Sequence, residues 1–95
     1  MFKLSIVETP EQRRLVLEGT LVRPWTAEVE RVWTSAGKEL RDRKLIIDLT
    51  NVTLINEDGE DTLFRLMREG ATFCSRDVLT KHVLKQLAQR CQCEP

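Results

Sequence analysis

Alternating apolar and polar residues mark the first twenty positions of the chain as a pair of strands. The segment Phe2–Val7 alternates until its end, and Arg13–Thr20 alternates again after a short polar turn that contains Pro10. A period of two is typical of a strand with one buried face, and proline cannot continue a strand ladder. Two such strands joined by a short turn predict an antiparallel hairpin. Leu15 and Leu17 fall on its buried face.

Three later segments change to the helical period. The first opens at Pro24, which costs no hydrogen bond in the first turn of a helix, and Gly37 is the expected cap at its end. The second helix follows an acidic run, and the third is entered through Ser75–Asp77. Spacings of three and four residues give each helix one apolar face. These faces contain Trp25, Val29, Val32, Trp33 and Ala36, then Leu63, Leu66 and Met67, and finally Leu79, Val83, Leu84, Leu87 and Ala88.

Short apolar runs between the helices complete the predicted fold. Leu45–Leu49 is rich in β-branched residues and predicts a strand covered on both faces, as in a parallel sheet. Asn51–Ile55 is a second short apolar stretch, and Ala71–Cys74 predicts a short buried strand. The order β-β-α-β-α-β-α predicts an α/β fold with a mixed, mostly parallel sheet and helices packed on it. We expect a single domain over residues 1–95, ordered from about 2 to 90 with a tail at 91–95.

Size and charge narrow the classes of function. The chain has 95 residues, which suits one small domain. Fifteen basic residues balance fifteen acidic ones, so the cationic surplus typical of nucleic-acid binding is missing. Apolar runs such as Leu45–Ile47 are far shorter than the roughly 20 residues that cross a bilayer, and the start does not resemble a signal peptide. We expect a soluble, cytoplasmic bacterial protein that binds neither membrane nor nucleic acid.

The cysteines and the single histidine do not suggest a reactive site. An odd number of cysteines without a secretory signal argues against a disulfide framework. Cys91 and Cys93, with the distant His82, match no four-ligand zinc spacing, so we expect a buried Cys74 and two thiols in a frayed tail. No phosphate-binding lysine motif or dinucleotide fingerprint is present. We therefore expect no metal, no cofactor, no catalytic residues and no enzymatic activity.

The acidic run Asn56–Asp61 is the feature that stands out. It carries carboxylates at Glu57, Asp58, Glu60 and Asp61, and it opens a helix, where negative charge faces the positive end of the helix dipole. An EF-hand calcium loop would need Gly59 at its sixth position, which puts Leu54 and Arg65 where acidic ligands belong. The run is therefore interpreted either as a helix cap that adds solubility or as a surface that docks a partner.

From Lys44 to Gly59 the sequence resembles a STAS domain, the fold shared by anti-sigma factor antagonists and the cytoplasmic tails of sulfate transporters. In that family a buried strand ends in Asp-Leu, here Asp48-Leu49, and a short apolar stretch follows. An Asp-Ser-Ser/Thr-Gly motif then opens a helix, where this chain has Asn56-Glu57-Asp58-Gly59. The upstream hairpin and the first helix fit the same plan. The resemblance implies a STAS-like fold that lacks the family's last strand and helix.

The resemblance also implies a protein–protein switch. In antagonists of this family, a hydroxyl at the helix start lets the domain bind an anti-sigma factor that is also a kinase, and phosphorylation releases it. Asp58 takes the phosphoacceptor position and Glu57 the position before it, so neither hydroxyl is present. Val22 replaces an aspartate that many antagonists carry. The nearby Thr53 and Thr62 are not convincing substitutes, because one is expected in a strand and the other past the first helical turn.

Together these features predict a non-catalytic signalling module that resembles an anti-sigma factor antagonist. Its partner would be a protein, for example an anti-sigma factor or a related kinase, and it would dock on Asn56, Glu57, Asp58, Gly59, Glu60 and Asp61. One alternative is a sensor of a small molecule or nucleotide, with Trp25 and Trp33 lining a pocket. Another is a structural subunit of a signalling assembly, in which an exposed sheet edge pairs two copies into a homodimer.

Overall fold

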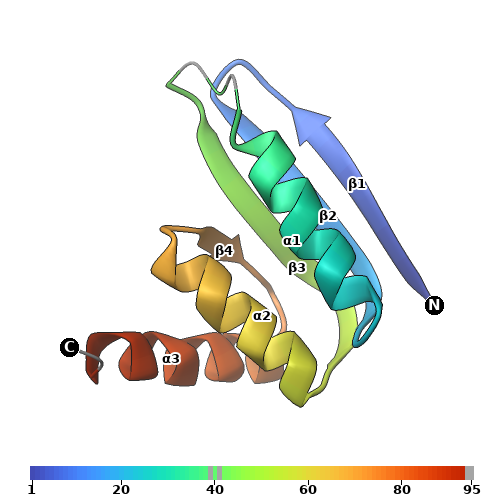
Figure 1. Ribbon diagram of the computed structural model, residues 1–95, viewed down its shortest axis with the longest axis vertical. Coiled ribbons are helices and arrows are strands. Elements are labelled where there is room, and N and C mark those ends of the chain that lie inside the picture. Colours follow the sequence, from blue (N-terminus) through green and yellow to red (C-terminus); the bar gives the residue numbers. More distant parts are fainter. Residues whose placement is uncertain (39, 41, 94–95) are drawn as a thin grey trace.

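The computed structural model describes residues 1–38, 40 and 42–93. These residues form four strands and three helices in the predicted order β-β-α-β-α-β-α (Figure 1). The elements are β1 (Phe2–Glu8), β2 (Gln12–Leu21), α1 (Trp25–Ala36), β3 (Lys44–Ile55), α2 (Glu57–Arg68), β4 (Thr72–Cys74) and α3 (Val78–Cys93).

The strands form one mixed sheet in the order β1-β2-β3-β4. Strands β1 and β2 are antiparallel, as the hairpin prediction requires, whereas β2, β3 and β4 run parallel. Parallel neighbours need a crossover, and α1 and α2 supply the two crossovers. The predicted α/β fold with a mostly parallel sheet is therefore confirmed.

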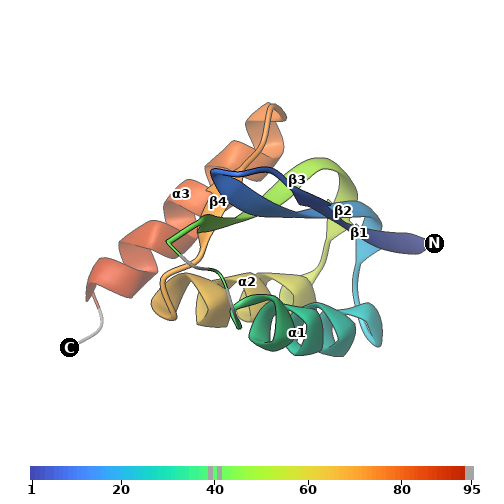
Figure 2. The same ribbon diagram turned by 90° about the horizontal axis from the view of Figure 1, so that it is seen from above.

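Helices α1 and α2 lie side by side on one face of the sheet, and α3 runs across the edge beside β4 (Figure 2). Leu15, Leu17, Ile47 and Leu49 point from the sheet toward α1 and α2 and are fully buried. The remaining core residues come from all three helices and from the strand ends: Leu21, Val29, Ala36, Val52, Leu63, Phe64, Leu66 and Leu87.

Both faces of β3 are covered along the predicted run Leu45–Leu49, where Ile47, Asp48 and Leu49 are buried and the other two residues are half-buried. Asp48 is paired in register with Val16, so it points to the face of the sheet opposite Leu15 and Leu17. The start of α3 lies on the side of the sheet opposite α1 and α2 (Figure 2), where Thr80 and Val83 line a pocket with residues 50–55 of β3. On this second face an ion pair with Arg14 covers Asp48, in place of an apolar contact.

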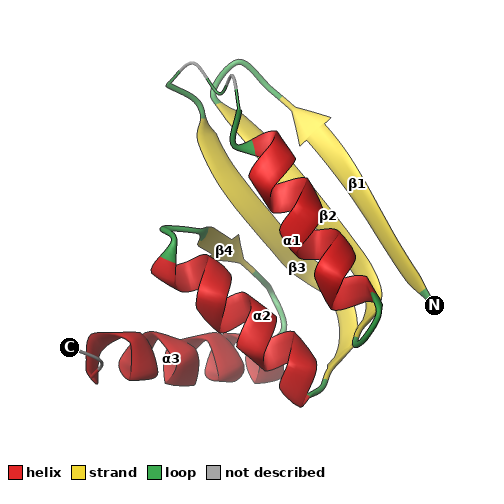
Figure 3. Ribbon diagram, viewed as in Figure 1, coloured by secondary structure: helices red, strands yellow, loops and turns green. Residues whose placement is uncertain are grey.

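Strand β3 is one continuous strand of 12 residues, where the sequence indicated a strand ending at Leu49 and a separate apolar stretch (Figure 3). It stays paired because its register with β2 shifts twice, between Val16 and Glu18 and between Gly19 and Thr20. Such bulges absorb extra residues without ending the pairing. Gly19 has a φ of 93°, and a Cβ there would lie 2.1 Å from the Met1 carbonyl oxygen, so only glycine fits.

Several local predictions need correction at the helix ends. Pro24 precedes α1 as its N-cap, one position before the first helical turn. Gly37 is the C-cap of α1, as predicted, in a right-handed conformation with φ of −71°. Helix α3 continues to Cys93, so residues 91–93 are helical rather than a tail. Each added residue extends the helical hydrogen bonding once a helix has formed. Residues 94–95 lie outside the described residues, and Cys74 is half-buried.

An ion pair on the second face of the sheet joins β2 to β3. Arg14 Nη1 donates to Asp48 Oδ2 at 3.1 Å, and the Thr50 backbone N–H donates to Asp48 Oδ1 at 2.9 Å. The Asp48 side chain is 12% exposed and that of Arg14 34%. Burial acts to raise the pKa of Asp48, but the hydrogen bonds from Thr50 and the charge of Arg14 outweigh it and hold the pKa below its ordinary value.

We expect Asp48→Asn to lower the free energy of unfolding by about 1–2 kcal/mol at neutral pH, because Arg14 loses its charged acceptor. The pKa of Asp48 is lower in the folded state than in the unfolded state. Its contribution is therefore complete above the unfolded pKa of about 3.9 and is lost as pH falls through the folded value. Urea unfolding of both proteins at a series of pH values measures this. A difference that stays constant down to the lowest pH would contradict the assignment.

Candidate functional site

The acidic segment lies where the parallel strands β2 and β3 both end. Strand β2 ends at Leu21 and continues through Val22–Pro24 into α1, and β3 ends at Ile55 and continues through Asn56 into α2. Because the two strands are parallel neighbours, the two loops lie side by side at the same edge of the sheet (Figure 3). In open α/β sheets this carboxyl edge is the usual place for binding sites.

Asn56 caps helix α2. Its backbone is extended, and its side-chain oxygen accepts a hydrogen bond of 2.9 Å from the Gly59 backbone N–H. Its carbonyl oxygen accepts from the Glu60 N–H, also at 2.9 Å. Asparagine is among the best N-cap residues because it satisfies donors that the first turn leaves unpaired. The start of the acidic segment is therefore fixed by its own side chain.

Gly59 presses the first turn of α2 against the end of β2. A Cβ at this position would lie 2.4 Å from the Leu21 carbonyl oxygen and 2.9 Å from the Ile55 Cγ2 atom. No side chain can occupy that space without displacing backbone. The sequence pattern indicates Gly59 as a calcium-loop or motif residue and does not predict this packing. The signal available in the sequence was a glycine inside the first turn of a helix, where it weakens the helix unless packing requires it.

The carboxylates surround this buried glycine on the surface. Glu57 and Asp61 are exposed, and Asp58 and Glu60 are half-buried. Asp58 lies toward the neighbouring loop, where its Oδ1 atom is 3.4 Å from Arg23 Nε. The opposite end of α2 carries Arg65 and Arg68, so the charges follow the helix dipole and the acidic end is locally stabilised.

The predicted site residues thus divide into two groups. Glu57, Asp58, Glu60 and Asp61 present carboxylates at or near the surface, whereas Gly59 is buried and positions them. The two hydroxyls near the segment behave differently from each other. Thr62 is fully buried in α2, and Thr53 is exposed on β3. A folded chain therefore offers no access to the Thr62 hydroxyl.

The structure was also searched for metal-ligating clusters and for helices that could span a membrane. Within the part of the chain that the structure describes, no three histidine, cysteine, aspartate or glutamate side chains gather into a metal site. Among the same residues, no helix has the length and apolar character that crossing a bilayer requires.

Similarity to a solved structure identifies the fold of this chain. The chain superposes on a protein of the DUF3478 family from Shewanella loihica PV-4, described as uncharacterized and as having a SpoIIAA-like fold, with a TM-score of 0.61. The match covers 94% of this chain and 79% of that chain at 11% sequence identity. The fold is SpoIIAA-like. The STAS-like fold that the segment from Lys44 to Gly59 indicated is thereby confirmed.

A second similar structure is the STAS domain of an antisigma-factor antagonist from Rhodobacter sphaeroides, with a TM-score of 0.46 and 21% identity. That match covers 78% of this chain and 84% of that chain. No family model and no curated protein matches this sequence.

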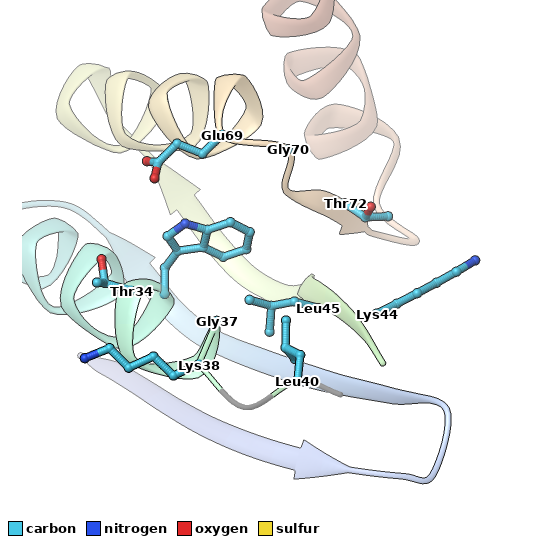
Figure 4. Close-up of a pocket in the computed structure, with 10 residues that line it drawn as sticks. Thr34, Gly37, Lys38, Leu40, Lys44, Leu45, Glu69, Gly70 and Thr72 are labelled. Atoms are coloured by element: carbon cyan, nitrogen blue, oxygen red, sulfur yellow. The ribbon is translucent and has the colours of Figure 1, made fainter. Parts of the chain in front are cut away.

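The two tryptophans of this SpoIIAA-like fold do not share a pocket, as the sensor hypothesis required. Trp33 lines a cavity of about 690 Å³ between the end of α1, the start of β3 and the turn from α2 to β4. Figure 4 shows the lining residues Leu45, on β3, and Glu69, after α2, with the Lys44 side chain pointing away. Trp25 is 38% exposed and instead stacks on Phe2 with ring centroids 5.8 Å apart. The Trp33 cavity lies at the opposite end of β3 from the acidic segment.

We expect Gly59→Ala to lower the free energy of unfolding by about 1–3 kcal/mol, because the new methyl group overlaps the Leu21 carbonyl oxygen. Gly37→Ala is the matched control. A Cβ at Gly37 makes only ordinary contacts of 3.5 Å or more, so its effect should stay within about 0.5 kcal/mol. Chemical denaturation of both variants measures the difference. Equal effects would mean that the close approach at Gly59 does not constrain the fold.

Proposed function

We propose that this protein is a non-catalytic signalling module that docks a protein partner through the start of helix α2. The docking surface consists of the carboxylates of Glu57, Asp58, Glu60 and Asp61, held by the Asn56 cap. The observation that carries the proposal is the rigid support beneath these charges. The Asn56 cap bond of 2.9 Å and the packing of Gly59 against Leu21 fix the backbone before any partner arrives.

A preformed surface favours binding because less conformational freedom is lost on association. The four carboxylates favour a partner whose contact patch is basic. Among the described residues, Asp58 pairs with the exposed Arg23, and no ion pair involves the other three carboxylates. Complementary charge of this kind speeds association and selects the partner more than it adds affinity.

The fold supports this proposal through the family resemblance noted from the sequence. In that resemblance, Asp58 takes the position of a phosphoacceptor hydroxyl. A carboxylate carries one permanent negative charge and cannot accept phosphate from a serine/threonine kinase, whereas a phosphoserine carries about −1.5 to −2 charges. The docking of this chain is therefore not regulated by phosphorylation at residues 56–61. An anti-sigma factor or a related kinase is the partner class that the resemblance favours.

A sensor of small molecules is the second candidate, and the Trp33 cavity is the observation that favours it. The cavity is walled by Trp33, Leu40 and Leu45, which suits an apolar or aromatic ligand. Binding there would change the tryptophan fluorescence. The acidic surface remains the stronger candidate because its geometry is fixed by several independent contacts.

The docking proposal predicts which surface changes abolish partner capture from an extract of the source organism. The immobilised wild-type protein should retain an anti-sigma factor or a related kinase, identified by mass spectrometry. The double variant Glu57→Lys/Asp61→Lys should associate with this partner about tenfold or more slowly than the wild-type protein at low salt. Glu69→Lys is the matched control, since it reverses an exposed carboxylate on the turn that follows α2 and should leave capture unchanged.

The variant Asp58→Ser distinguishes two roles of the aspartate: an acid that the partner tolerates, or an imitation of a phosphorylated residue. Capture by wild type and variant alike means that the acid is tolerated and the module is unregulated, as proposed here. Capture by Asp58→Ser alone would mean that Asp58 imitates a phosphorylated, released state. Absence of any such partner on every variant would contradict the docking proposal.

A further inference from the structure

The outer edge of the sheet is formed by β1, and half of the backbone groups of this strand face outward. The Met1 carbonyl accepts from the Thr20 N–H, and the Thr9 N–H donates to the Gln12 carbonyl. In an antiparallel ladder, hydrogen-bonded positions alternate along the strand. Odd-numbered residues of β1 therefore bond to β2. The backbone N–H and C=O groups of Phe2, Leu4, Ile6 and Glu8 point away from the sheet.

From this edge we infer that the protein forms a symmetric homodimer in which β1 pairs with β1 of a second copy. The two strands run antiparallel, related by a two-fold axis through Ser5. In this register Leu4 faces Ile6 of the second copy, Phe2 faces Glu8, and Lys3 faces Val7. It is the register that pairs all of Phe2–Glu8 and joins the two sheets into one. Each outward residue then exchanges its free backbone groups with its opposite residue.

The side chains along this edge match a second copy rather than water. Ile6 is 50% exposed, and the half-buried Leu4 and Phe2 lie on the same side of the strand, toward α1. Trp25 extends this apolar strip by stacking on Phe2. The two-fold axis brings Leu4 and Ile6 of both copies together, so the most exposed apolar residue of the strip becomes covered. Apolar cross-strand pairs are the units that stabilise a sheet.

The charges along the edge are compatible with this pairing. Lys3 and Glu8 are the charged residues of β1, and neither faces a like charge in the proposed register. Glu8 is already bound by Arg13 and Arg43. Arg31 of α1, which flanks both Leu4 and Ile6, is paired with Glu28. The net charge of the chain is zero, so no net-charge repulsion opposes the association of two copies.

The same edge is only partly protected against pairing, because its two charged residues, Lys3 and Glu8, lie near the ends of the strand. Natural edge strands are commonly blocked by proline, by inward-pointing charge or by a covering helix. The seven residues of β1 contain no proline. The opposite edge differs, because β4 is only three residues long and α3 passes beside it (Figure 2). The docking surface at the start of α2 lies at the ends of β2 and β3, whereas the proposed pairing uses the outer edge of β1.

Sedimentation velocity of the wild-type chain, from the low micromolar to the millimolar range, tests the dimer. The mass should approach twice the 11.0 kDa of one chain. Ile6→Pro removes an outward N–H that β2 does not use, and Ile6→Lys places a charge opposite Leu4 of the second copy. Both should stay monomeric, with circular dichroism confirming the fold. Leu54→Lys is the matched control, since Leu54 is 55% exposed on β3 and the variant should still dimerise.

Two outcomes would overturn the inference: a wild-type chain that remains monomeric throughout, or a dimer that persists in both Ile6 variants. A disulfide tests the register itself. Opposite residues in a non-hydrogen-bonded pair have Cα atoms about 4.5 Å apart, within the range of a disulfide. With the native cysteines changed to serine, Ser5→Cys should therefore oxidise to a covalent dimer, and Lys3→Cys should not. Equal cross-linking of the two would contradict the proposed axis.

Discussion

The contact between Gly59 and the Leu21 carbonyl oxygen is the constraint on which the rest of the site depends. It joins the end of β2 to the first turn of α2, two segments that meet only because β2 and β3 are parallel and end at the same edge. Any side chain larger than hydrogen would push α2 away from the sheet. The Asn56 cap then sets the direction of the helix, and the carboxylates of the acidic segment take fixed positions as a result.

This arrangement separates stability from recognition within a few residues. Asn56 and Gly59 hold the backbone, whereas Glu57 and Asp61 face solvent and carry little of the fold. Asp58 contributes to both stability and recognition, because it is partly exposed and also contacts Arg23 of the neighbouring loop. A partner that approaches the acidic end of α2 would meet this second loop too. The proposed dimer uses β1, so docking and self-association occupy different surfaces of the same sheet.

Much of the fold could be predicted because local patterns decided it. The hairpin, the three helices and the acidic helix start follow from periods of two and of three to four residues, and the structure has all of them. Contacts between distant segments could not be predicted. The pairing of Arg14 with Asp48 depends on the β2–β3 register. The register shifts that keep β3 continuous lie next to Gly19, which packs closely against the Met1 carbonyl oxygen. The helical period also placed Trp25 and Trp33 on one face of α1, but Trp33 lines a cavity and Trp25 stacks on Phe2 of the neighbouring strand.

Hydrogen exchange at the start of α2 tests the central claim most directly, namely that the docking surface is formed before a partner binds. The Gly59 N–H donates to the Asn56 side chain and the Glu60 N–H to the Asn56 carbonyl. First-turn amides of a helix commonly exchange through local fraying, at a small cost in free energy. In this protein the Gly59 and Glu60 amides should instead exchange with an opening free energy close to that of the core amides of β3. Rapid exchange at both positions would mean that the segment is mobile and that the rigid surface does not exist.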